Sequence, residues 1–144
     1  AAPAASQTPA QQQHAAQLAT AVLLVEVMRA DPAIGTAERL AVVQALRSKF
    51  SLADDELDRL LELAQAQASA LYDYHQFTST INDHFAHPQK VQMIEAMWRV
   101  AYADAHLDTH ENHVISKVAG LLHVTHGEYI AAKLHARDAI PPEV

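Results

Sequence analysis

The sequence contains no cysteine, only three glycines and no long hydrophobic run. Because cysteine is absent, neither a disulfide framework nor a thiolate zinc site can form. The glycines stand apart and no serine lies in a nucleophile elbow, which excludes a glycine-rich phosphate loop and that type of hydrolase site. The longest apolar stretch, residues 18–27, is interrupted by Glu26 and is far shorter than the ~20 residues that cross a bilayer. We therefore expect a cytoplasmic protein with no transmembrane segment in this chain.

Charge and composition further restrict the class of protein to which this chain can belong. The formal net charge is -7 and the basic residues are scattered, so no patch suits a phosphate backbone and no nucleic-acid partner is expected. A chain of 144 residues suits one domain. Alanine, leucine, glutamine and glutamate are abundant, and no segment alternates with the period of a strand. These features predict an all-α protein with a proper core.

The apolar periodicity predicts a compact bundle of about seven helices. Residues 1–13 are low in complexity and are expected to form a disordered N-terminal arm. Residues 14–138 would form the helical domain, and residues 139–144 a frayed tail.

Capping residues and prolines predict where the helices begin and end. The first helix should begin near His14 and end near Ala30. The later helices are expected to begin at or just after Thr36, Ser51, Asp73, Pro88, Thr109 and Thr125. In the second helix, a stripe that includes Leu40 and Leu46 should face inward. The acidic run around Asp55 on the third helix is expected to be a solvated face.

One pattern occurs twice, about half the chain apart. An apolar helical run that ends in Ala-Asp is followed by a short loop and a threonine cap, from Asp31 to Glu38 and again from Asp104 to Glu111. Helices one to three and five to seven therefore form two pseudo-symmetric three-helix units, with the fourth helix as connector. The apolar sides of the two units should pack together. Because equivalent turns lie symmetrically about the axis of such a pair, we expect the acids of the two turns to approach one another.

These residues resemble the TerB-like family, which is named for tellurite resistance. The signature Ala-Asp-x-x-Ile/Leu-x-x-x-Glu is found at residues 30–38 and 103–111, and residues 121–133 are similar to the family's closing helix pair. The similarity covers roughly residues 18–137. It implies an all-helical, non-enzymatic domain associated with tellurite resistance and chemical stress response, in which acidic residues are suspected of binding cations.

The sequence departs from the family pattern after each aspartate. Where the family usually has glycine, this chain has Pro32 and Ala105. Pro32 keeps Asp31 away from the helical region, so the first loop should be the stiffer one. At the position directly after the Ile/Leu of the signature, the first copy has Gly35 and the second has Asp108. A metal site would therefore be better preserved at the second copy.

The acids of the two turns are the candidate metal ligands: Asp31, Glu38, Asp104, Asp108 and Glu111. Hard cations bind several oxygen ligands gathered on a loop and a helix start, so Ca²⁺, Mg²⁺, Mn²⁺ or Zn²⁺ is the expected cofactor if these acids form a site. The spacing does not match the calcium loop of the EF-hand. The alternative is structural, because an acid at a helix exit can satisfy loop amides and an acid in a first turn complements the helix dipole.

Histidine gives a second, separate candidate. His106, His110 and His113 are spaced by four and three residues, and on one helix face they could hold Zn²⁺ or Ni²⁺ together with a neighbouring acid. The expected cap at Thr109 instead places His106 in the loop, which favours scattered surface histidines. The segment from His110 to His113 has one residue too few for the zinc-peptidase motif.

Two functions of different classes are compatible with these features. The first is a non-enzymatic TerB-like module that binds a divalent cation and acts as an interaction or sensing domain, with protein partners that include a membrane-associated stress-response complex. The second is a purely structural adaptor whose apolar grooves dock a partner and whose acids only cap helices. A small metal-dependent hydrolase ranks third, because no nucleophile and base stand out. The aromatic residues, Trp98 among them, are expected in the core rather than around a cofactor.

Overall fold

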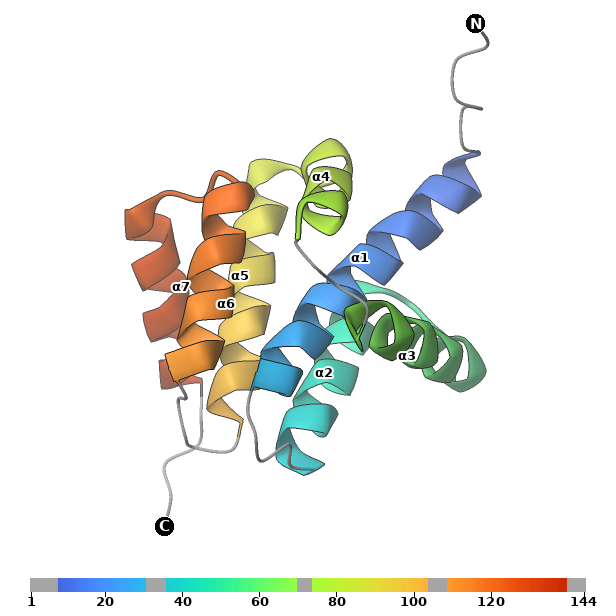
Figure 1. Cartoon of the computed structure of the whole chain (residues 1–144), viewed down its shortest axis with the longest axis horizontal. Coiled ribbons are helices and arrows are strands. Elements are labelled where there is room, and N and C mark those ends of the chain that lie inside the picture. The colour runs from blue at the N-terminus through green and yellow to red at the C-terminus, as the bar shows by residue number, and fades with distance from the viewer. Residues whose placement is uncertain (1–7, 31–35, 70–73, 104–108, 140–144) are drawn as a thin grey trace, which may run out of the picture.

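Seven α-helices make up the described part of the chain in this computed structural model (Figure 1). The structure describes residues 8–30, 36–69, 74–103 and 109–139, and the side chains of all of these except 69 and 109–111. The helices are α1 (Pro9–Ala30), α2 (Thr36–Lys49), α3 (Asp54–Ser69), α4 (His75–His84), α5 (His87–Tyr102), α6 (Thr109–Leu121) and α7 (His126–Asp138). These ranges contain no strand, which confirms the prediction of an all-α bundle of about seven helices.

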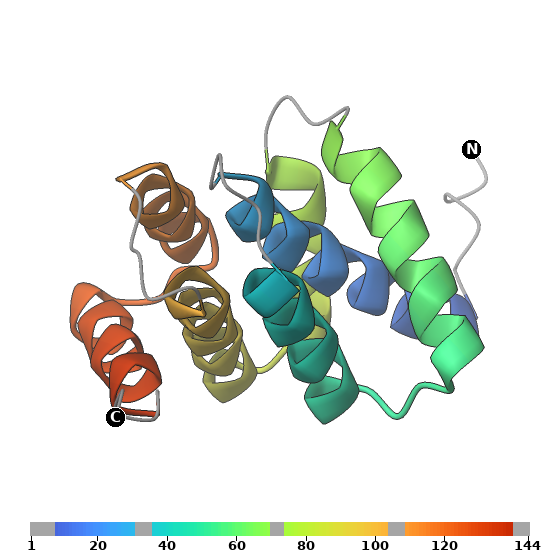
Figure 2. The same ribbon diagram turned by 90° about the horizontal axis from the view of Figure 1, so that it is seen from below.

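The helices pack in a reciprocal pattern around α1 and α5. Helix α1 contacts α2 and α3, and α5 contacts α6 and α7 in the same way. The two central helices also contact each other, and each contacts one helix of the other unit, α1 with α6 and α5 with α2. Figure 2 shows α5 between α2 and α7. Two three-helix units related by a twofold axis would produce this pattern of contacts.

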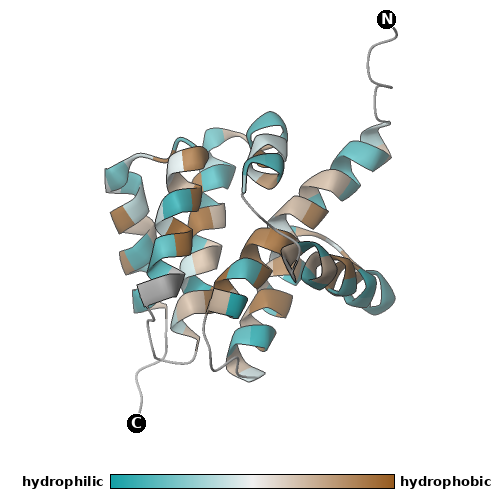
Figure 3. Ribbon diagram, in the orientation of Figure 1, coloured by the Kyte–Doolittle hydropathy of each residue, from teal (hydrophilic) through white to brown (hydrophobic). Residues whose placement is uncertain are grey.

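The core follows the two central helices. Nearly every side chain from Ala19 to Met28 of α1 is buried, and the hydrophobic stretch of α1 lies in the middle of the bundle (Figure 3). In α5, Met97 and Trp98 are fully buried. The prediction that Trp98 belongs to the core is therefore confirmed. Among the described helices, none is long and apolar enough to cross a membrane.

Helix α1 begins earlier than the sequence predicted. It starts at Pro9, so residues 9–13 are helical rather than part of the expected arm. The Thr8 amide donates to the Gln11 side chain at 2.9 Å, and the Gln11 amide donates to the Thr8 hydroxyl at 3.1 Å. This reciprocal cap and the proline at the first helical position explain the early start. The remaining arm and the tail, residues 1–7 and 140–144, lie outside the described residues.

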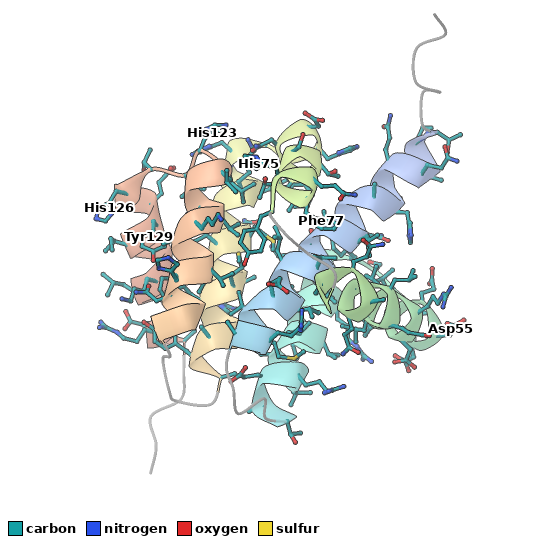
Figure 4. All side chains as sticks on the ribbon, in the orientation of Figure 1. Asp55, His75, Phe77, His123, His126 and Tyr129 are labelled. Carbon is teal, nitrogen blue, oxygen red and sulfur yellow. The ribbon has the colours of Figure 1, made fainter. Side chains whose placement is uncertain are left out.

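The helix caps agree with the sequence at some positions and differ at others. Thr125 caps α7 as predicted, because its hydroxyl accepts from the Glu128 amide at 3.2 Å and its own amide donates to the Glu128 carboxylate at 2.9 Å. Helix α3 begins at Asp54, three residues after the start expected at Ser51, and the Ala53 amide donates to the Glu56 side chain at 3.0 Å. Charged side chains along α3 are exposed, and Figure 4 shows Asp55 at the outer end of that helix.

The register of α2 corrects a prediction. Its fully buried face consists of Glu38, Val42 and Leu46, at intervals of four residues. Leu40, which was expected to face inward, is 53% exposed. The apolar pattern misled because the buried stripe begins with a carboxylate. If Glu38 is assumed to lie on the surface, the predicted inward face of α2 shifts to the side of Leu40.

Candidate functional site

Among the five acids predicted as metal ligands, only Glu38 has a side chain that the structure describes. It lies in the first turn of α2 and is completely buried. Asp31, Asp104 and Asp108 fall outside the described residues, and so does the side chain of Glu111. A carboxylate removed from water needs hydrogen bonds, a cation or a proton to compensate its charge. Glu38 is therefore unusual, because a residue type that normally lies on the surface is here fully buried.

The helix ends that flank the two acidic turns lie at the same end of the bundle. Helices α1 and α5, which precede the turns, end there, and α2 and α6, which follow them, begin there (Figures 1 and 2). The contacts of α1 with α6 and of α2 with α5 agree with this arrangement. The distances between the acids themselves remain a prediction, since four of the five lie outside the described side chains.

No metal centre is formed by the side chains that the structure describes. Within them, no group of three or more histidine, aspartate or glutamate residues is placed to hold an ion. His113 is exposed on α6, while His106 and the side chain of His110 fall outside the described set. The zinc or nickel hypothesis for these histidines therefore stays a prediction.

A partly buried polar contact that the sequence did not predict joins α1 to the start of α4. The Tyr74 hydroxyl donates to one oxygen of Glu26 at 3.4 Å, and Arg29 donates to the other oxygen at 3.0 Å. Burial raises the pKa of Glu26, and burial together with the Glu26 charge raises the pKa of Tyr74 to about 12. The ammonium of Lys117 lies 5.5 Å from the centre of the Tyr74 ring. The interruption of the apolar run at Glu26 was the only signal in the sequence.

A groove of about 900 Å³ is lined by α2, α5 and the end of α7. Among the residues that the structure describes, three charged side chains line it: Lys49, Glu95 and Arg99. Arg99 donates to Glu95 at 3.2 Å, and His135 of α7 contacts the other oxygen of the same carboxylate. Burial lowers the pKa of Lys49, an effect that Glu95 opposes and Arg99 reinforces. No sequence motif predicts this groove, because its residues come from separate helices.

An aromatic cluster forms where α5 meets α7. The ring of Trp98 lies 5.8 Å from that of Tyr102 and 5.4 Å from that of Tyr129. The ammonium of Lys133 lies 5.1 Å from the Trp98 ring centre. Next to this cluster, the ring of His126 stacks on Tyr129 at 6.1 Å (Figure 4). These contacts hold α5 and α7 together, so this cluster is a structural one.

Comparison with known families bears directly on the repeated acidic signature. The profile of the family described as tellurite resistance protein TerB matches residues 17–134. No match was found among curated proteins or among solved structures. The matched segment includes both copies of the signature and extends into α7. Since it covers well over half of the chain, this protein belongs to the TerB family.

Proposed function

We propose that this TerB-family chain is a non-enzymatic module that binds a divalent cation through the acids of its two repeated turns and reports the bound state to protein partners in a chemical stress response. The observation that carries the proposal is the complete burial of Glu38 at the end of the bundle where the two turns are attached. A divalent cation is one group that stabilises a carboxylate in such a place.

The repeated signature supports a site with several oxygen ligands. Asp31 and Glu38 belong to the first turn, and Asp104, Asp108 and Glu111 belong to the second. Ca²⁺ takes six to eight oxygen ligands, whereas Mg²⁺ requires a tighter octahedral arrangement and Zn²⁺ prefers nitrogen and sulfur as well. A site built from carboxylates alone therefore favours Ca²⁺ or Mn²⁺ over Zn²⁺.

Calorimetric titration of chelator-stripped protein with Ca²⁺, Mg²⁺, Mn²⁺ and Zn²⁺ tests this proposal. Wild type should bind at least one ion. The double variant Asp104→Asn, Glu111→Gln should lose that binding while its circular dichroism stays helical, because both changes keep shape and remove charge. The matched control is Asp55→Asn, which removes one carboxylate from the exposed face of α3. Wild type that binds none of the four ions would refute the cation-binding role.

A structural adaptor is the second candidate, and the position of Glu38 favours it independently. An acid in the first turn of a helix complements the helix dipole, which is worth about 0.3–1 kcal/mol. In that case Asp104→Asn, Glu111→Gln and Glu38→Gln should alter the melting temperature without changing the response to ions. An ion response that survives these changes, combined with a lower melting temperature, would support the capping role.

A further inference from the structure

The residues that line the groove follow both α2 and α5 along their lengths. From α2 it is lined by Ala37, Ala41, Gln44 and Ser48, at intervals of four, three and four residues. From α5 it is lined by Gln89, Gln92, Ala96 and Arg99, at intervals of three, four and three. Each helix therefore presents one full stripe along its length, and the α2 stripe alone spans about 16 Å at ~1.5 Å per residue. A helix of about three turns matches this length.

The walls of the groove are shaped for close approach by another helix. Alanines line part of the groove on α2, and Ala136 and Ala139 close it at the end of α7. Small side chains let two helix axes approach toward the short end of the usual 8–10 Å range. Leu40 stands on the wall of the groove and is 53% exposed. Only Leu40 and Leu134 are large hydrophobic side chains exposed among the described residues.

The charge of the groove is opposite to that of the chain. Among the described lining residues, two cations, Lys49 and Arg99, face one carboxylate, Glu95, in a chain whose net charge is -7. The carboxylate is already engaged by Arg99 and His135. Lys49 makes no ion pair within 4.0 Å with another described residue and is partly buried. A partly buried ammonium of this kind gains most from an incoming negative charge.

We propose that the groove formed by α2, α5 and the end of α7 binds an acidic amphipathic helix of a partner protein. The apolar side of that helix packs on Leu40 and the alanines of α2, and its carboxylates pair with Lys49 and Arg99. This mode is the docking of a helix into a groove through side chains three and four residues apart. The inference names the partner for the interaction role proposed above, and it does not depend on a bound cation.

A second copy of this chain is a poorer occupant. The acidic helix of the described region, α3, packs its leucines against the core and exposes polar residues, so it offers no apolar stripe to the groove. Two grooves facing each other would bring Lys49 and Arg99 of both copies together, and like charges at an interface are unfavourable. A helix of another protein with leucines on one face and glutamates on its flanks can pack on the apolar wall and also pair with the cations.

Fluorescence anisotropy with synthetic helical peptides tests the proposal on the full chain. The probes are labelled peptides of about 14 residues that carry leucine at intervals of three and four, with glutamate on both flanks. A matched set carries lysine in place of glutamate. The glutamate peptides should bind, their affinity should fall as salt rises, and the lysine peptides should bind more weakly by about tenfold or more. Failure of every glutamate peptide to bind, or equal binding of both sets, overturns the proposal.

Paired variants identify the surface that binds. Leu40→Glu and Lys49→Glu should each weaken binding of the glutamate peptides by about tenfold or more. Leu134→Glu, on the exposed side of α7, and Arg59→Glu, on α3, are the matched controls for the same changes outside the groove. Their binding should equal that of wild type. If the control variants lose as much peptide affinity as the groove variants, the peptide binds elsewhere and the assignment to the groove is overturned.

Two further measurements separate this inference from its alternatives. Sedimentation of the unliganded protein should show a monomer at micromolar concentration, and a dimer that Leu40→Glu dissociates would mean that a second copy covers the groove. Peptide binding should be the same in a chelator as with Ca²⁺, and the Asp104→Asn, Glu111→Gln variant should retain it. Wild type that binds the peptide but none of the ions would therefore reject the cation role alone, and wild type that binds an ion but no glutamate peptide would reject the groove alone.

Discussion

The Nε2 atom of His87, in the first turn of α5, lies 2.9 Å from both carboxylate oxygens of Glu128, in the first turn of α7. The same carboxylate accepts a hydrogen bond from the Thr125 amide at 2.9 Å. One glutamate thus completes the cap of α7 and joins α7 to the beginning of α5. The Thr125 amide, followed by His87, lowers the pKa of Glu128.

The lowered pKa of Glu128 predicts a pH dependence of stability. The folded state favours the carboxylate, so its contribution is present above the usual value of 4.5 and is lost as the pH falls through the lowered value. Glu128→Gln keeps a capping side chain and removes the charge. We expect this variant to melt below wild type at pH 7, and the two melting temperatures to converge in acid, as measured by circular dichroism.

Thr125→Ala serves as the control for this prediction, because it removes the cap at every pH. It should lower the free energy of unfolding by about 1 kcal/mol. If Glu128→Gln and wild type differ by the same amount at pH 3 and at pH 7, the charge of Glu128 does not contribute as described.

The register of α2 predicts opposite results at two leucines six residues apart. Leu46 is fully buried, so Leu46→Ala should cost about 2–5 kcal/mol of unfolding free energy. Leu40 is half-exposed on the groove wall, and Leu40→Ala should change stability by no more than about 0.5 kcal/mol. Urea denaturation of both variants measures the difference. Comparable losses at the two positions would mean that α2 is turned toward the register predicted from the sequence.

Helix α2 also shows which parts of the structure could be predicted from the sequence. The start of α2 at Thr36 and the cap of α7 were predicted correctly. The cap of α7 could be predicted because Thr125 acts through local hydrogen bonds that a short segment determines. The buried face of α2 was predicted wrongly, since burial of Glu38 depends on the helices packed around it rather than on its polarity. The groove could not be predicted at all, because α2, α5 and α7 come together only in the folded chain.

The turn between α6 and α7 contains a residue whose backbone would suit glycine better. His123 has a φ of 62°, in the left-handed region. The Val124 amide donates to the Ala119 carbonyl at 3.0 Å and the His123 amide to the Gly120 carbonyl at 3.2 Å, which is the Schellman arrangement at a helix end. Because glycine adopts this conformation without strain, His123→Gly should raise the unfolding free energy by up to about 1 kcal/mol.

Thermal melts compare His123→Gly with His123→Ala. Alanine has the same difficulty at positive φ, so it should not stabilise the protein. A melting temperature that falls in the glycine variant would show that the imidazole makes a contribution larger than the backbone strain.

The two acidic turns should respond unequally if they bind ions. Pro32 restricts how Asp31 can turn, and Gly35 supplies no side-chain oxygen where Asp108 does. In an NMR titration with Ca²⁺, amide shifts should begin between Asp104 and Glu111, with smaller or later changes in the first turn. Simultaneous, equal changes would instead indicate a single joint site.

The reciprocal packing of α1 on α6 and of α5 on α2 removes any natural line of division between the two halves of the molecule. Opening either half would expose the apolar side of the other to water, at a cost that grows with the area uncovered. A half-open intermediate is therefore disfavoured, and the bundle should unfold as one cooperative unit. A partner that docks in the groove between α2 and α5 consequently stabilises the whole molecule.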